Sequence, residues 1–225
     1  MVVFGTLFGY GNDHARTVAV KAVARANDLE LDFRQDLKSP DHLKVNKLGK
    51  VPAFEGTDGF KLFETIAIAL YFTSQNEEST TPLLGKSKKD YAEIVKWMSY
   101  FNTEVMYPIG GQLYPLVGAH PYNKELVDIY ATNAKKATDA VEEYLREENR
   151  EYLVGDTITL ADIFCASLFS VGFRYFYGKV WREENPNLFR WFERMWKHPA
   201  VAGVLEGELV YLDEPRYTNK PPEGK

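Results

Sequence analysis

A proline inside a strand pattern is the strongest constraint on how this chain can fold. Residues 51–54 have the apolar composition of a short strand, and residues 60–63 repeat it after a tight turn at Asp58-Gly59, so the stretch predicts a β-hairpin. Pro52 has no N–H group to donate to a sheet, which requires an edge, a bulge or a cis peptide bond. We expect a cis Val51-Pro52 bond, which would leave the Val51 N–H and C=O free for a ligand.

A helix is expected directly after this hairpin. Glu64 and Thr65 stand at the start of the apolar run 65–72, which is typical of a buried helix. The first turn of a helix presents unpaired N–H groups and the positive end of the helix dipole, and both attract anions. We expect an extended peptide to lie along Val51 with its carboxylate at this helix start.

Three further segments complete the N-terminal half. Residues 2–8 are β-branched and aromatic, residues 18–26 place valines and alanines among basic residues, and residues 29–34 alternate strictly. These patterns predict a strand, a partly buried helix and a half-buried strand, with a right-handed crossover. With the hairpin and the helix from Thr65, the order is βαβ followed by ββα, the order of an α/β thioredoxin-like domain.

A polar segment separates this half from the rest of the chain. Residues 75–82 show no apolar periodicity, which predicts an interdomain linker. We therefore place the domains at residues 1–79 and 80–214. Residues 215–225 contain three prolines and predict a tail or the start of a further linker.

The second domain is predicted to be all-helical. Apolar residues recur at helical spacing over 91–105 and 126–145, and residues 187–197 form a further amphipathic pattern. Pro108 and the Gly110-Gly111 pair are expected to kink or end the first of these helices.

One further helix start carries a capping signal. Thr159 is a plausible N-cap with Asp162 as its acidic partner three residues later, flanked by an Ile158–Ile163 hydrophobic staple.

Charge and cysteine content restrict the function. The 225 residues carry a formal net charge of −5 and a single cysteine, Cys165. The charge argues against nucleic acid or a membrane as the main partner, and one cysteine excludes an internal disulfide. Because the start of the chain is not a signal peptide, we expect a reduced, cytoplasmic setting. Neither metal-ligand spacing nor a Gly-rich phosphate loop occurs, so neither a metal nor a nucleotide is expected.

The hairpin and the following helix start resemble the glutathione site of cytosolic glutathione transferases. In that family a cis Val-Pro binds the cysteinyl backbone of glutathione, as Val51-Pro52 would here, and a Glu-Ser pair holds the γ-glutamyl end, as Glu64-Thr65 would. Residues 5–8 and 48–54 look most like the transferase-like domain of the gamma subunit of translation elongation factor 1. The resemblance implies the glutathione transferase fold over nearly the whole chain, with Lys38 and Lys50 contacting the glycine carboxylate and the cysteinyl region.

The resemblance also implies a group that stabilises the glutathione thiolate, because a free thiol has a pKa of about 8.5. Tyr10 corresponds to the tyrosine of Tyr-type enzymes, and Asn12 lies near the serine position of Ser-type enzymes, so both are candidates. His14, at a helix start with no acidic partner nearby, fits a capping role better than a catalytic one. On the helix expected to face the glutathione site, the candidates for an acceptor pocket are Tyr100, Phe101, Met106, Tyr107 and Tyr114. Most aromatic stripes of this kind are core, and from this set we expect Tyr100, Met106 and Tyr107 to line the pocket.

Two functions follow from the resemblance. The first is a homodimeric glutathione transferase that joins the glutathione thiolate to an apolar electrophile. The second is a non-catalytic assembly domain of the elongation factor 1 gamma subunit, which would dock another subunit of that factor and keep a vestigial glutathione site.

Overall fold

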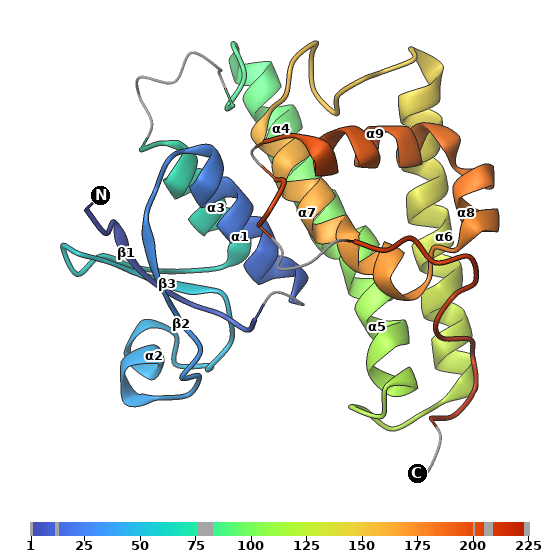
Figure 1. Ribbon diagram of the computed structural model, residues 1–225, viewed down its shortest axis with the longest axis horizontal. Coiled ribbons are helices and arrows are strands. Elements are labelled where there is room, and N and C mark those ends of the chain that lie inside the picture. Colours follow the sequence, from blue (N-terminus) through green and yellow to red (C-terminus); the bar gives the residue numbers. More distant parts are fainter. Residues whose placement is uncertain (1, 12–13, 76–82, 200, 205–208, 223–225) are drawn as a thin grey trace.

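The computed structural model describes residues 2–11, 14–75, 83–199, 201–204 and 209–222. A small sheet flanked by helices forms one half, and a group of longer helices forms the other (Figure 1). This arrangement confirms the predicted thioredoxin-like half followed by an all-helical half. The predicted boundary between residues 79 and 80 lies outside the described residues.

Four strands form the sheet in the order β2-β1-β3-β4. β1 runs parallel to β2 and antiparallel to β3, and β3 pairs antiparallel with β4. Both N-terminal strands begin later than their sequence patterns, because pairing sets in only at Gly5 and Leu31. The strands are β1 (Gly5–Phe8), β2 (Leu31–Arg34), β3 (Ala53–Gly56) and β4 (Lys61–Phe63).

Alternation along β1 divides the sheet into two packed faces. Leu7 joins the main core with α1 (Ala15–Ala26) and α3 (Thr65–Thr73). Phe8 points to the other face, where it packs with Ala53 and with Val45 of α2 (Pro40–Val45). Figure 1 shows α2 on the opposite side of the sheet from α1 and α3.

The helical half begins with one long, locally irregular rod. A π-helical turn, η1 (Phe101–Val105), separates α4 (Lys88–Tyr100) from α5 (Met106–Leu116). The sequence predicts a kink or a helix end at Pro108 and the Gly110-Gly111 pair, but these residues lie inside α5. The irregular turn is η1, one turn before them. Pro108 cannot donate to the Glu104 carbonyl, and its ring would clash with that carbonyl in a regular helix, which accounts for the position of η1.

Four further helices complete the described helical half. The predicted helix over 187–197 is confirmed as α9, and 126–145 lies within α6. None of the helices in the described part of the chain is long and apolar enough to cross a bilayer. The helices are α6 (Lys124–Glu147), α7 (Leu160–Tyr175), α8 (Lys179–Glu184) and α9 (Pro186–Lys197).

The two halves share a single hydrophobic core. α7 packs directly against α1, and residues of both helices, including Val20 and Phe169, are fully buried in the same cluster. Thr159 and Asp162 form a capping box at the start of α7. The fully buried Asp162 also accepts a hydrogen bond from the Trp191 indole Nε1 at 2.9 Å, which ties the start of α7 to α9.

Candidate functional site

Strand register brings three loops to one edge of the sheet. Phe8, the last residue of β1, pairs with Ala53, the first residue of β3, and Ala53 pairs with Phe63, the last residue of β4. The chain leaves β1 into the loop that precedes α1, enters β3 from Pro52, and leaves β4 into Glu64. Candidate residues from three separate parts of the sequence therefore lie side by side.

The peptide bond between Val51 and Pro52 is cis, which confirms the prediction from the proline in the strand pattern. Pairing of β3 with β1 starts at Ala53, after the proline. Among the described residues, no hydrogen bond engages the N–H or C=O of Val51. These two groups are therefore available to pair with an extended peptide.

A buried histidine and a buried asparagine hold the segment before Pro52. The Lys38 N–H donates to His42 Nδ1 at 2.9 Å, so the neutral ring carries its proton on Nε2, which donates to the Lys50 carbonyl at 3.2 Å. Asn46 Nδ2 donates to the same carbonyl at 3.0 Å. His42 thus fixes the backbones of Lys38 and Lys50 beside the hairpin, while both lysine residues are exposed. Sequence reasoning missed His42 and Asn46.

Glu64 has a backbone conformation that is unusual for a side chain of its kind. Its φ is 75°, and it is the N-cap of α3 without a hydrogen bond from its side chain to the helix. Residues other than glycine adopt this left-handed region at a cost, and such positions concentrate at functional sites. The exposed Glu64 carboxylate and the buried Thr65 thus stand together at a helix start that favours anions.

His14 is the N-cap of α1, and its Nδ1 accepts a hydrogen bond from the Thr17 N–H at 3.3 Å. Burial and, secondarily, the charge of Arg16 lower the pKa of His14 from 6.5 to about 4. The imidazole is therefore neutral at pH 7 and caps the helix, as its position at the helix start indicated.

Tyr10 is 55% exposed, with its ring centroid 5.4 Å from that of His14. The other thiolate candidate, Asn12, lies outside the described residues.

A cavity of about 560 Å³ opens between the two halves beside Tyr10. The start of α1 forms one wall, and α5 and the end of α7 form the others. Its lining is mostly apolar and aromatic, which suits an apolar small molecule. The residues that line it are Tyr10, Gly11, His14, Ala15, Arg16, Met106, Gly110, Leu113, Tyr114, Val171 and Tyr175.

The predicted acceptor residues are divided between two places. Met106 lines this cavity, whereas Tyr100 and Tyr107 line a separate groove of about 640 Å³ between η1, α5 and α6. The reason is packing against α6: the Tyr100 hydroxyl donates to the Ala137 carbonyl at 3.1 Å, and the Tyr107 ring stands 5.8 Å from that of Tyr130.

Arg16 is a further residue that sequence reasoning missed. It lines both the cavity and the groove, and its Nε donates to Asn102 Oδ1 at 2.9 Å. This bond joins α1 to η1 across the boundary between the two halves.

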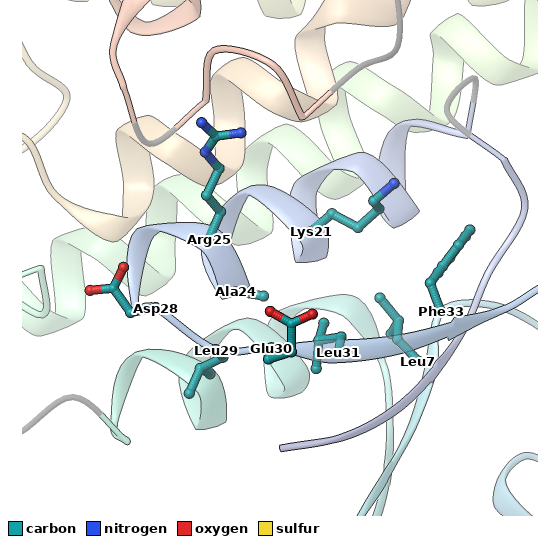
Figure 2. A pocket seen from close by; sticks show the side chains of 9 residues that line it. All are labelled: Leu7, Lys21, Ala24, Arg25, Asp28, Leu29, Glu30, Leu31 and Phe33. Atoms are coloured by element: carbon teal, nitrogen blue, oxygen red, sulfur yellow. The ribbon is translucent and has the colours of Figure 1, made fainter. Parts of the chain in front are cut away.

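A third cavity lies away from these residues. It has a volume of about 330 Å³ and lies between α1 and the edge strand β2, where Lys21 and Arg25 project from the helix above Leu31 and Phe33 (Figure 2). The Lys21 ammonium stands 4.7 Å from the centroid of the Phe33 ring. None of the predicted site residues that the structure describes lines this cavity, so the candidate site is the sheet edge with the 560 Å³ cavity beside it.

Two family models match the chain, one in each half. The family model described as "Glutathione S-transferase, N-terminal domain" matches residues 5–74, and "Glutathione S-transferase, C-terminal domain" matches residues 94–199. The chain is 54% identical to glutathione S-transferase psoE of Aspergillus fumigatus, over 100% of this chain and 92% of that protein.

Elongation factor 1-gamma proteins are more distant relatives. The chain is 33% identical to elongation factor 1-gamma 1 of Saccharomyces cerevisiae, over 94% of this chain but only 51% of that protein. The crystal structure of the GST-like domain of elongation factor 1-gamma from the same yeast superposes with a TM-score of 0.81 at 32% identity, covering 99% of this chain and 100% of that one.

Proposed function

Because the chain belongs to the glutathione S-transferase family, we propose that it joins the thiolate of glutathione to an electrophilic, apolar acceptor. The observation that carries this proposal is the single sheet edge at which the unpaired backbone of Val51, the Glu64-Thr65 helix start and the mostly apolar cavity meet. A peptide thiol bound at this edge would reach the cavity in which an acceptor is held.

Each part of the tripeptide has a chemically matched partner. The cysteinyl backbone pairs with the N–H and C=O of Val51. The α-ammonium of the γ-glutamyl end pairs with the exposed Glu64 carboxylate, and its α-carboxylate lies at the first turn of α3, at Thr65. We assign Lys38 and Lys50 to the glycine carboxylate and the cysteinyl region. His42 holds the backbones of both beside the hairpin, which supports this assignment.

We assign stabilisation of the thiolate to the Tyr10 hydroxyl. Tyr10 lines the cavity and lies two residues after the end of β1. A hydrogen bond to the charged form of a group lowers its pKa, which raises the fraction of thiolate, the reactive species. Asn12 is the competing assignment. We do not assign this role to His14. Because it is neutral, it neither forms an ion pair with a bound thiolate nor takes up a proton at neutral pH.

The test of the binding mode is Glu64→Ala, measured by calorimetry with glutathione. The substitution removes a charge-assisted hydrogen bond, which contributes about 1.5 to 3 kcal/mol. Affinity should fall by about tenfold or more. The matched control is Glu125→Ala, an exposed residue in the first turn of α6, which should bind as the unaltered chain does. Equal affinities for the two variants would refute the proposed site.

The likeness to the yeast elongation factor domain supports a second candidate. In that function the chain docks a translation elongation factor subunit and turns over no substrate. Conjugation of glutathione to a generic haloarene separates the two: sustained turnover supports the transferase, whereas glutathione binding without turnover supports the docking domain. We propose that the transferase acts as a homodimer in the cytoplasm.

A further inference from the structure

The described part of the C-terminal segment, residues 209–222, is fixed to the helical half although none of these residues lies in a helix or strand. Figure 1 shows it, in red, crossing that half from α8 towards the end of α5. Its upper part is anchored by the Lys179 N–H, which donates to the Asp213 carbonyl at 2.8 Å, and by Arg182 Nη1, which donates to the Leu212 carbonyl at 2.7 Å. Residues 214–222 follow, and we call them the C-terminal strap.

The strap caps the end of α7 at a residue that lines the cavity. Tyr175 is the last residue of α7, and the last carbonyls of a helix have no partner within it. The N–H groups of Arg216 and Tyr217 donate to the Tyr175 carbonyl at 2.9 and 3.4 Å. The Tyr217 ring stands 5.9 Å from the Tyr175 ring. The strap thus fixes one wall of the cavity from behind.

The other end of the strap holds the loop behind the opposite wall. Tyr122, just before α6, donates its hydroxyl to Asn219 Oδ1 at 2.9 Å, and Asn219 Nδ2 donates to the Lys124 carbonyl at 3.0 Å. The same loop carries His120, whose N–H donates to the Tyr114 carbonyl at 3.2 Å and whose ring lies 5.2 Å from that of Tyr114. Tyr114 lines the cavity from α5.

We propose that the C-terminal strap determines which acceptors the cavity takes. It does so by holding Tyr175 and Tyr114, which stand on different helices, at a fixed separation across the cavity. Arg216, Tyr217 and Asn219 act as positioning residues, because none of them lines the cavity. The proposal rests on the proposed function, since it concerns the apolar group to be joined to glutathione.

Binding of S-alkylglutathiones tests the proposal without requiring turnover. S-methylglutathione reports on the glutathione site alone, and S-hexylglutathione places an alkyl chain in the cavity. In Tyr217→Ala and in Asn219→Ala, the affinity for S-hexylglutathione should fall relative to that for S-methylglutathione by about threefold or more. The first variant loses the ring contact with Tyr175, and the second loses the side-chain hydrogen bonds to Tyr122, Lys124 and Asp128. The control is Lys220→Ala, an exposed strap residue whose side chain forms no hydrogen bond or ion pair with the described residues, and it should leave the ratio unchanged.

A milder variant keeps the test valid if a strap substitution impairs folding. Tyr122→Phe removes only the hydroxyl that binds Asn219, and it should shift the ratio in the same direction as Asn219→Ala. The double variant should shift it by less than the sum of the two single variants, because both of them remove the hydrogen bond between the Tyr122 hydroxyl and Asn219 Oδ1. An unchanged ratio in Tyr217→Ala, Asn219→Ala and Tyr122→Phe would overturn the strap proposal alone. Failure of the unaltered chain to bind S-methylglutathione would overturn the proposed function and the strap proposal together.

Discussion

Replacing Asp162 by Ala should lower the free energy of unfolding by about 4 kcal/mol. Asp162 is fully buried, and its carboxyl group accepts four hydrogen bonds. The Leu153 N–H and the Trp191 indole N–H donate to Oδ1 at 2.8 and 2.9 Å. The N–H and the hydroxyl of Thr159 donate to Oδ2, both at 2.9 Å. Burial raises the pKa of Asp162, and the four hydrogen bonds oppose that shift.

The magnitude follows from the donors left behind. Alanine accepts none of the bonds, so three buried N–H groups lose their partner at about 1 to 3 kcal/mol each, partly offset because the carboxyl group no longer has to be buried. Asp162→Asn keeps one carbonyl oxygen for Leu153 and Trp191, and its amide can donate to the Thr159 hydroxyl. Only the Thr159 N–H then meets the side-chain NH₂ group, a donor, where it had an acceptor. The free energy of unfolding of this variant should therefore fall by about 1 to 2 kcal/mol.

Equilibrium unfolding in urea measures these differences. The control is Asp139→Ala, which removes an exposed carboxylate paired with Lys135 on α6 and should cost less than about 1 kcal/mol. A loss below about 1 kcal/mol in Asp162→Ala would refute the reasoning. So would equal losses in Asp162→Ala and Asp162→Asn, because the asparagine variant keeps an acceptor for two of the buried N–H groups and the alanine variant keeps none.

Two further predictions concern the start of α1. The pKa of His14 is lowered from 6.5 to about 4, so the unfolded chain takes up a proton at a higher pH than the folded chain, and the free energy of unfolding should decline by up to about 3 kcal/mol as pH falls from 6.5 to 4. His14→Asn keeps a neutral N-cap and should flatten this decline, measured by urea unfolding at several pH values. An identical pH dependence in the variant and the unaltered chain would refute the prediction. Tyr10→Phe should raise the pKa of bound glutathione by about 1 to 2 units, read from thiolate absorbance, with affinity for S-methylglutathione preserved. A shift seen instead in Asn12→Ala would transfer the role to Asn12.

Local chemistry made the hairpin and its surroundings predictable. A proline in a strand pattern, an Asp-Gly turn and a polar pair before an apolar run are each recognisable within a few residues. The cis bond at Val51-Pro52 and the ββα order follow from such short-range signals. Strand ends were less predictable, because Val2 and Val3 have strand composition but no partner strand in register.

Contacts between distant residues could not be predicted in this way. Arg16 and Asn102 are 86 residues apart, and Tyr122 and Asn219 are 97 apart. Helical spacing groups Tyr100 and Tyr107 with Met106, but packing against α6 decides which groove each of them lines. The prolines of the C-terminal segment favour a tail, yet its described residues bind α7 and the start of α6.

The geometry of the site depends on strand register rather than on contacts among the site residues themselves. Phe8, Ala53 and Phe63 lie in one row across three strands, and Tyr10, Val51 and Glu64 each lie just beyond one of these positions. A one-residue slip of β3 against β1 would move Phe54 out of the core and turn Ala53 to the opposite face. The buried Phe54 and Phe8 on opposite faces of the sheet therefore hold Val51 beside Tyr10 and Glu64. Substitutions of the exposed Glu64 and Tyr10 should accordingly change ligand binding without changing the fold.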